Sequence, residues 1–268
     1  RVGLCALGIK AYTVALLFVL SRQTGVRDGY EAFVHVPDGE TRASRLAAAQ
    51  ESFLERLAPY DGQYYLDIAD RGYRIFPKGR PSEPQGPPGN FAFFPLLPLL
   101  LRSAKALVGH EGALGLMLLL NVALSGLAAV GVHALARRIG APPWPSALPV
   151  LTFPTAVFQC ALYTESLCLC LSVAVALCAA SGRFAAGTAL GYLAGMCRPQ
   201  GALAGALWAG RIMGLRHSTG DRRAATGRAI LAAAAPLLGV ATFAAVLWLE
   251  IGAPLGFVGI QREWAREF

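Results

Sequence analysis

The chain alternates between long apolar blocks and short polar connections, many of them basic. A helix that crosses a bilayer needs about 20 mostly apolar residues, so blocks of this length predict membrane spans. The clearest blocks are residues 4–20, 112–136 and 230–249. We therefore expect an all-α fold, in the form of a polytopic transmembrane protein.

Two helical pairs are predicted between these blocks. The first pair joins residues 145–160 to 163–180 through the turn "YTES", and the second joins 184–197 to 202–215 around "RPQG". At about 1.5 Å of rise per residue, the helices of the second pair are short, which favours tilted, broken or half-buried helices. The apolar run 91–101 is also too short to span and contains two prolines, so it predicts an interfacial or re-entrant helix.

A long polar segment, residues 21–90, separates the first span from the rest. It holds nine Lys/Arg and ten Asp/Glu residues, and it ends in the Pro/Gly loop "PKGRPSEPQGPPGN". The whole pattern predicts one domain over residues 1–268 with about seven spans, plus interfacial helices within 21–90. Because the chain begins at Arg1 and ends directly after a predicted membrane exit, we expect a fragment that lacks its C-terminal part.

Composition and charge agree with a membrane protein. Hydrophobic residues make up 55% of the chain and the mean hydropathy is +0.48, whereas a soluble domain is usually about 45–50% apolar. The net charge of +8 does not indicate nucleic-acid binding, because the basic residues lie between apolar blocks instead of forming a stripe on a soluble module. Short basic loops belong on the cytoplasmic side.

The basic loops define an orientation. They lie at Arg137, at Arg183 and over residues 211–228, and these we place in the cytoplasm. The span count then places 21–90, "YTES", "RPQG" and the residues after Glu250 outside the cell. The polar and aromatic residues on that outer face are predicted to share one cleft: Asp61, Asp67, Asp70, Tyr163, Glu165, Arg198, Gln261 and Trp264.

The stretch "YDGQYYLDIADRGY", residues 60–73, holds three aspartates and four tyrosines in an otherwise apolar chain. Asp61 has two interpretations, a helix N-cap or a chemical group. An apolar and aromatic stripe at helical spacing predicts a helix lying on the membrane surface. Asp67 and Asp70 either form a solvated face paired with arginines or contact a substrate. The stripe comprises Tyr65, Ile68, Ala69 and Tyr73, and the arginines are Arg71 and Arg74.

Charged residues at the ends of the predicted membrane helices are further candidates for the functional site. Glu165 in "YTES" is either a helix-start residue or a functional carboxylate, since a carboxylate near a membrane core is costly. Arg198 in "RPQG" either binds a phosphate or extends to the lipid head groups, and Arg102 has the same two interpretations. Gln261 and Trp264, three residues apart, form either a platform for a sugar or part of a membrane aromatic belt.

Motifs for other chemistries are absent from the sequence. There is no P-loop, GxSxG, HExxH or GxGxxG motif. "DIAD" is not a DxD motif, so no cofactor is expected and no divalent metal is indicated. The six cysteines form no CxxC pair or zinc-ligand spacing, and we interpret them as small buried apolar residues. They are Cys5, Cys160, Cys168, Cys170, Cys178 and Cys197.

Five motifs in order resemble the PIG-V family, which comprises GPI mannosyltransferase II and its bacterial relatives. They are "YDGQYYLDIADRGY", the "AFFPLLPLL" segment, "PTAVFQCALYTESL", "RPQG" and "QREW". The resemblance covers residues 60–264. The sequence departs from the family pattern at Tyr60, where Trp is usual, and at Cys197, where Ser or Thr is common. The Ala-, Arg- and Gly-rich composition is more similar to a bacterial relative.

The resemblance implies a GT-C-like fold and a mannosyltransferase. Such an enzyme takes a hexose from a polyprenyl-phosphate sugar and transfers it, with inversion, to a lipid-linked or glycan acceptor. Asp61 corresponds to the catalytic base. Arg198 would bind the leaving phosphate, with Arg102 as the second candidate. Glu165 would either bind acceptor hydroxyls or position the helix that carries Asp61. Tyr64, Tyr65, Tyr73 and Trp264 would offer stacking faces for sugars.

The expected partners are thus the lipid-linked donor, the acceptor and membrane lipids, but no nucleic acid. We expect a multi-pass protein of the bacterial cell membrane, or of the ER membrane in a eukaryote, with an extracytoplasmic active site. A transporter or flippase for a lipid-linked glycan is an alternative, although it predicts an internal repeat that is not evident. A non-catalytic membrane scaffold is another alternative.

Overall fold

The structure is a computed structural model, and it describes residues 54, 58, 61–76, 89–208, 210–211 and 222–263. The predicted span 4–20, most of the polar segment 21–90 and Trp264 lie outside these residues. The part of the chain that is described consists of helices and connections and contains no β-strand beyond an isolated bridge between Ile75 and Gly89. The predicted all-α class is therefore confirmed for this part of the chain.

The helices differ widely in length, and two segments wind as 3₁₀ helices. The elements are α5 (Asp61–Arg71), α6 (Leu96–Arg138), α7 (Pro143–Thr152), η1 (Pro154–Cys160), α8 (Glu165–Ser181), α9 (Phe184–Cys197), η2 (Pro199–Ala206), α11 (Arg222–Ile251) and α12 (Gly256–Glu263).

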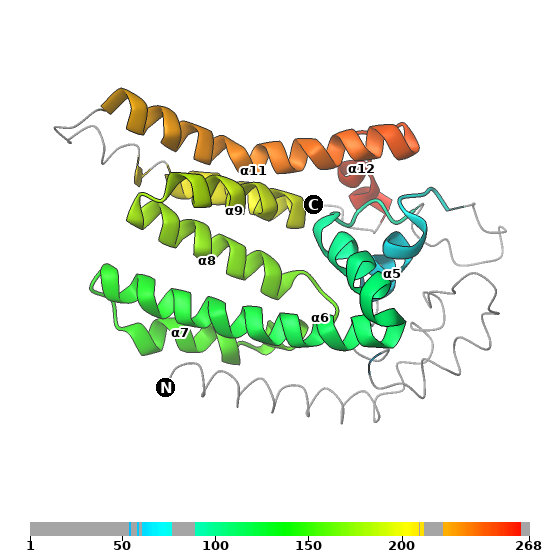
Figure 1. Ribbon diagram of the computed structural model, residues 1–268, viewed down its shortest axis with the longest axis horizontal. Coiled ribbons are helices and arrows are strands. Elements are labelled where there is room, and N and C mark those ends of the chain that lie inside the picture. The colour runs from blue at the N-terminus through cyan, green and yellow to red at the C-terminus, as the bar shows by residue number, and fades with distance from the viewer. Residues whose placement is uncertain are drawn as a thin grey trace.

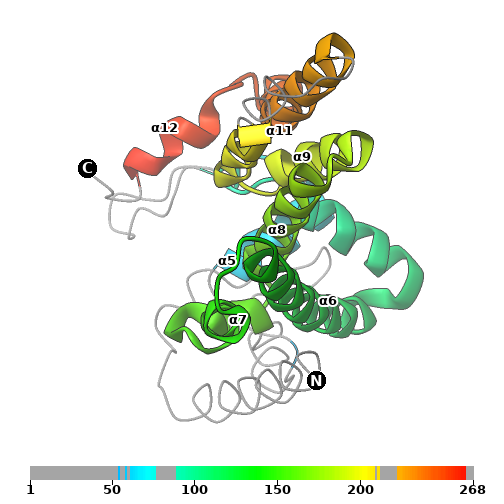
Figure 2. The ribbon, with the colours of Figure 1, turned by 90° about the vertical axis from the view of Figure 1, so that its left-hand side faces the viewer.

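The long helices form a row. Figure 1 shows α6, α8, α9 and α11 side by side along the long axis, with α7 against α6. The same order is visible in the view along the row in Figure 2. The short helices α5 and α12 both lie at the end of this row where α11 ends (Figure 1). The row therefore provides a frame that holds α5 at its end.

Two of these helices are long and apolar enough to cross a membrane, namely 96–138 and 223–251. The predicted spans 112–136 and 230–249 fall within them. α8 and α9 match the predicted segments 163–180 and 184–197, but they have only 17 and 14 residues. Two helices of spanning length are weak support for a membrane protein, and the predicted number of about seven spans stays a prediction.

Residues 145–160 were predicted to form one helix, and this prediction is wrong. Helix α7 ends at Thr152, and Pro154 begins the 3₁₀ helix η1. Phe153 is extended, with φ −59° and ψ 141°, because the ring of the following proline disfavours a helical backbone at that position. The predicted helix 202–215 likewise begins as the 3₁₀ helix η2, and residues 212–215 lie outside the described part.

A bend at Gly109 divides α6 into a short arm and a long one. Gly109 has φ 73° and ψ −178°, a backbone that glycine adopts readily and side-chain-bearing residues rarely do. The apolar run 91–101 and the span 112–136 thus lie on the two sides of one bend. Leu101 before the bend and Met117 after it both pack beneath α5, so the bend wraps α6 around that helix.

Basic side chains gather at the end of the row opposite α5. Arg138 on α6 donates a hydrogen bond to Ser181 at the end of α8, with 2.6 Å between Nη1 and Oγ. Arg211 lies beside Gly182, since its Nη2 would be 2.9 Å from a Cβ atom there. At the α5 end, Asn121 of α6 donates to the carbonyl of Ala161 at 2.5 Å. The predicted basic loops therefore share one end of the row.

Helices α9 and α11 are in backbone contact through glycines. A Cβ atom at Gly195 would lie 1.9 Å from the Pro236 carbonyl oxygen, and one at Gly239 would lie 2.3 Å from the Tyr192 oxygen. Small residues allow helices to approach this closely, and such packing is common in membrane bundles. The α9–α11 pair therefore has no room for added side-chain atoms at these positions.

Gly195→Ala is expected to destabilise the protein, because the methyl group would force two backbones apart, at a cost of about 2 kcal/mol. Gly227→Ala in α11 is the matched control, since nothing lies within 4 Å of its Cβ position. It should be neutral or slightly stabilising. Thermal unfolding midpoints in detergent would compare the two variants, and equal midpoints would contradict the close contact.

Candidate functional site

Helix α5 is enclosed, which corrects the prediction of a helix on the membrane surface. Residues 62–69 are all buried, so both the apolar stripe and the opposite side are covered. The polar side is accommodated by local contacts that a periodic pattern does not reveal. Gln63 donates to the carbonyl of Ala58 at 2.6 Å. Gly62 lets α5 approach the Leu162 carbonyl, which would lie 3.4 Å from an added Cβ atom.

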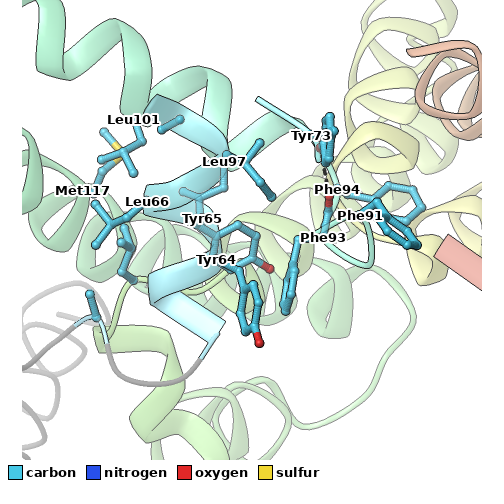
Figure 3. Close-up of a cluster of buried hydrophobic side chains, with 14 of the residues drawn as sticks. Tyr64, Tyr65, Leu66, Tyr73, Phe91, Phe93, Phe94, Leu97, Leu101 and Met117 are labelled. Carbon is cyan, nitrogen blue, oxygen red and sulfur yellow. Dashed lines mark hydrogen bonds between the residues drawn. The ribbon is translucent and has the colours of Figure 1, made fainter. Parts of the chain in front are cut away.

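An aromatic cluster surrounds α5 (Figure 3). The Tyr64 ring stacks on Phe93 with 4.8 Å between centroids, and the Tyr65 ring meets Phe93 edge-on at 5.2 Å. Tyr73 donates its hydroxyl to the Phe93 carbonyl at 2.8 Å, and its ring packs against Phe243 on α11. These three tyrosines, predicted to stack on sugars, are buried and contact other protein rings.

Burial also affects the tyrosine hydroxyls. Desolvation raises the pKa of Tyr64, and the negative charges of Asp61 and Asp67 raise it further. Desolvation likewise raises the pKa of Tyr65 and of Tyr73. All three hydroxyls are therefore neutral at physiological pH. They can donate or accept hydrogen bonds, but they do not supply a phenolate.

Asp67 is buried within an arginine and asparagine network. Its carboxylate accepts two hydrogen bonds from Arg74, one of them from Nε at 3.2 Å, and one from Asn90 Nδ2 at 2.8 Å. Arg71 approaches to 3.8 Å. Asn90 also donates to the Gly72 carbonyl and accepts from the Arg74 backbone amide. The predicted pairing with Arg71 and Arg74 is confirmed, but the carboxylate is buried instead of solvated.

The other end of α5 is held by α6. Asp70 lies at the surface and pairs with Lys105. Arg102 donates from Nε to the Ala69 carbonyl at 2.6 Å, where the last carbonyls of a helix need donors. Arg102 thus caps α5 in this structure, a contact that the sequence did not indicate.

Five residues from three distant segments form what we call the end cluster: Asp61, Tyr65, Thr164, Glu165 and Arg198. The Tyr65 hydroxyl lies 3.2 Å from Thr164 Oγ1. Arg198 donates from Nη1 to Glu165 Oε1 at 2.5 Å. The charges of Arg198, Glu165 and Asp61 all act on the Tyr65 hydroxyl. The charges of Asp61, Glu165 and Arg198 therefore all reach one hydroxyl, and the cleft that these residues were expected to share stays a prediction.

Helix ends position the charged members of this cluster. Asp61 and Glu165 lie in the first turns of α5 and α8, where a carboxylate is favourable because free backbone N–H groups point toward it. Helix α9 ends at Cys197, and Arg198 is extended with φ −158° and ψ 157° because Pro199 follows it. Arg198 therefore leaves the helix at the level where α8 begins.

The ion pair between Glu165 and Arg198 leaves hydrogen-bonding atoms of both side chains available. Burial opposes the charge of Arg198, but the adjacent Glu165 carboxylate outweighs it and raises the pKa of the guanidinium. Glu165 Oε2 is buried and has no hydrogen-bond partner within the described part of the chain. Nη1 of Arg198 makes one bond, and an arginine has five N–H donors in all. The pair can therefore accept and donate further hydrogen bonds to a ligand.

The remaining predicted residues lie around this cluster in different ways. Tyr163 is buried, with its ring 5.2 Å from that of Phe158, and its carbonyl accepts from Asn121. Gln261 lies on α12, where Nε2 is 3.4 Å from the Phe257 carbonyl of the same helix. Trp264 is outside the described residues. Sequence analysis did not single out Thr164, although its place directly before Glu165 was a usable signal.

A metal group and a cavity were both sought in the described part of the chain. Among the described residues, no group of three or more His, Cys, Asp or Glu side chains could hold a metal ion. A cavity of about 260 Å³ lies near the basic end of the row instead. It is lined by Ala176, Ala179, Ala180, Leu207, Gly210 and Arg211.

Comparison of the chain with protein-family models, with curated proteins and with solved structures finds no match. The resemblance to the PIG-V family therefore depends on the five sequence motifs alone. The geometry of the end cluster is the independent observation on which a functional proposal can be built.

Asp67→Ala is expected to destabilise the protein by about 3 kcal/mol, because it removes the acceptor shared by Arg74 and Asn90 inside the protein. Asp70→Ala is the matched control. Its surface pair with Lys105 should contribute less than about 1 kcal/mol. Thermal midpoints in detergent would rank the variants, and a larger loss for Asp70→Ala would contradict a structural role for Asp67.

Proposed function

We propose that the protein is a membrane glycosyltransferase that moves a hexose, namely mannose, from a polyprenyl-phosphate sugar to a lipid-linked or glycan acceptor. The single observation that supports this proposal best is the end cluster. It combines an aspartate at a helix start, a carboxylate and an arginine, drawn from three of the five motifs that resemble the PIG-V family.

An inverting transfer needs one base. Displacement at the anomeric carbon requires a carboxylate that takes the proton of the acceptor hydroxyl, and a positioned base contributes about 10²–10⁴-fold. Asp61 is half-buried in the first turn of α5, with Tyr65 on the same helix, so its position is set by the buried part of that helix. We assign it the role of base.

The leaving group is a lipid phosphate, which needs a cation more than a proton. Arg198 keeps its charge beside Glu165, and its planar fork suits a phosphate. Glu165, with its unpartnered Oε2, would hold an acceptor hydroxyl or keep Arg198 in place until the donor arrives. The neutral hydroxyls of Tyr65 and Thr164 would complete the polar lining.

The proposed setting is the outer surface of a cell membrane. The two membrane-length helices and the separation of the basic end from the end cluster support this orientation. There the cluster would meet a donor whose lipid tail lies in the bilayer and whose sugar lies at the surface.

Asp61→Asn should reduce transfer of label from polyprenyl-phosphate-[³H]mannose by about 10²-fold or more, because the amide cannot take the acceptor proton. Membranes that contain the full-length protein would be assayed at matched expression, with Asp70→Asn as the control. We expect the control to transfer at the wild-type rate. Equal transfer by Asp61→Asn and wild type would exclude Asp61 as the base. If neither wild type nor the two variants transferred label, polyprenyl-phosphate mannose would be excluded as the donor.

Arg198→Gln should lower transfer by about 10²–10³-fold, because the phosphate loses its cation. Arg198→Lys should recover only part of this loss, since an ammonium lacks the fork. Arg228→Gln, at an exposed position of α11 near the basic end, is the control and should leave transfer unchanged. Full activity of Arg198→Gln would exclude the phosphate-binding role.

A further inference from the structure

Two cysteines from neighbouring helices meet directly behind the end cluster. Cys168 lies in the first turn of α8, and its backbone amide donates to the Thr164 carbonyl at 2.8 Å. The Cys197 thiol, at the end of α9, lies 3.9 Å from the same carbonyl oxygen. Both residues therefore contact the same carbonyl oxygen, which places the two cysteines next to each other, and each thiol influences the ionisation of the other. Cysteines that the sequence indicated as separate apolar residues thus form a pair.

The two thiols differ in exposure. Cys197 is 1% exposed and belongs to the core between α8, α9 and α11, whereas Cys168 is half-buried at the edge of that core. Cys170 and Cys178 lie farther along α8, and only burial and, for Cys178, the charge of Arg183 act on their thiols. Within this pair, a reagent in solution would therefore reach Cys168 before Cys197.

We propose that Cys168 and Cys197 are a disulfide-forming pair that locks the end of α9 to the start of α8. The sulfur atoms of a disulfide lie about 2 Å apart, so the two cysteines, which contact the same Thr164 carbonyl oxygen, need a local shift before they can be joined. The cross-link would join the residue directly before Arg198 to a residue one helical turn after Glu165. It therefore fixes the backbone on which the Glu165–Arg198 pair is built.

The oxidant is a disulfide of the thiol-exchange class, for which oxidised glutathione is the probe. The Cys168 thiolate attacks one glutathione sulfur, forms a mixed disulfide and releases one glutathione thiolate. The Cys197 thiolate then attacks the Cys168 sulfur and releases the second. Two protein thiols are oxidised and one oxidised glutathione is reduced to two glutathione molecules, because the protons of the two protein thiols pass to the two released glutathione thiolates.

The first test is peptide mapping of the detergent-purified full-length protein after treatment with oxidised glutathione. We expect a Cys168–Cys197 cross-linked peptide in wild type. Cys197→Ser should instead carry a glutathione adduct on Cys168, because no second thiol resolves it. Cys168→Ser should carry no adduct on Cys197, because that thiol is buried. The control Cys170→Ser should form the same cross-link as wild type.

The second test is thermal stability. Oxidation should raise the unfolding midpoint of wild type and of Cys170→Ser, and reduction with dithiothreitol should reverse the shift. The midpoints of Cys168→Ser and Cys197→Ser should not respond to oxidation. Absence of the cross-linked peptide in wild type, or its formation only after denaturation, would overturn the proposal. Neither peptide mapping nor thermal stability requires glycosyl transfer. The disulfide proposal can therefore be confirmed or overturned independently of the proposed function.

Discussion

The structure around the candidate site depends on one buried carboxylate. Asp67 has 6% of its surface exposed, and a charge at such a position is tolerated only when it is paired and hydrogen-bonded. Arg74 and Asn90 meet this requirement, and both come from outside α5. The network therefore joins α5, the turn that follows it and the chain that enters α6 into one unit. Without it, the first turn of α5, with Asp61, would have no fixed place.

The aromatic rings complete this unit from the other side. Phe93 contacts Tyr64 and Tyr65 through its ring and Tyr73 through its carbonyl, so one residue links both ends of the tyrosine-rich stretch. Phe243 of α11 closes the cluster toward the row. The tyrosines that first suggested a sugar site are thus chiefly the packing that holds Asp61 and Thr164 in position.

The sequence predicted those parts of the fold that depend on local pattern. Apolar length located α8, α9 and the membrane-length parts of α6 and α11, and the motifs pointed to Asp61, Glu165 and Arg198. Contacts between residues far apart in the chain could not be predicted from the sequence. Periodicity could not reveal that Asn90 satisfies Asp67, that Arg102 caps α5, or that Cys168 meets Cys197. The break at Phe153 was readable from Pro154, but apolar length outweighed that signal.

The glycine contact between α9 and α11 has a consequence for motion near the candidate site. Because the Pro236 carbonyl would lie 1.9 Å from a Cβ atom at Gly195, the two backbones touch without intervening side chains. Side chains that change rotamer are what allow one helix to slide past another, and none is present at this contact. We therefore expect α9 to move together with α11, as one body. Any adjustment that brings Arg198 to a ligand must arise after the last turn of α9, in its own side chain and in the 3₁₀ segment that follows.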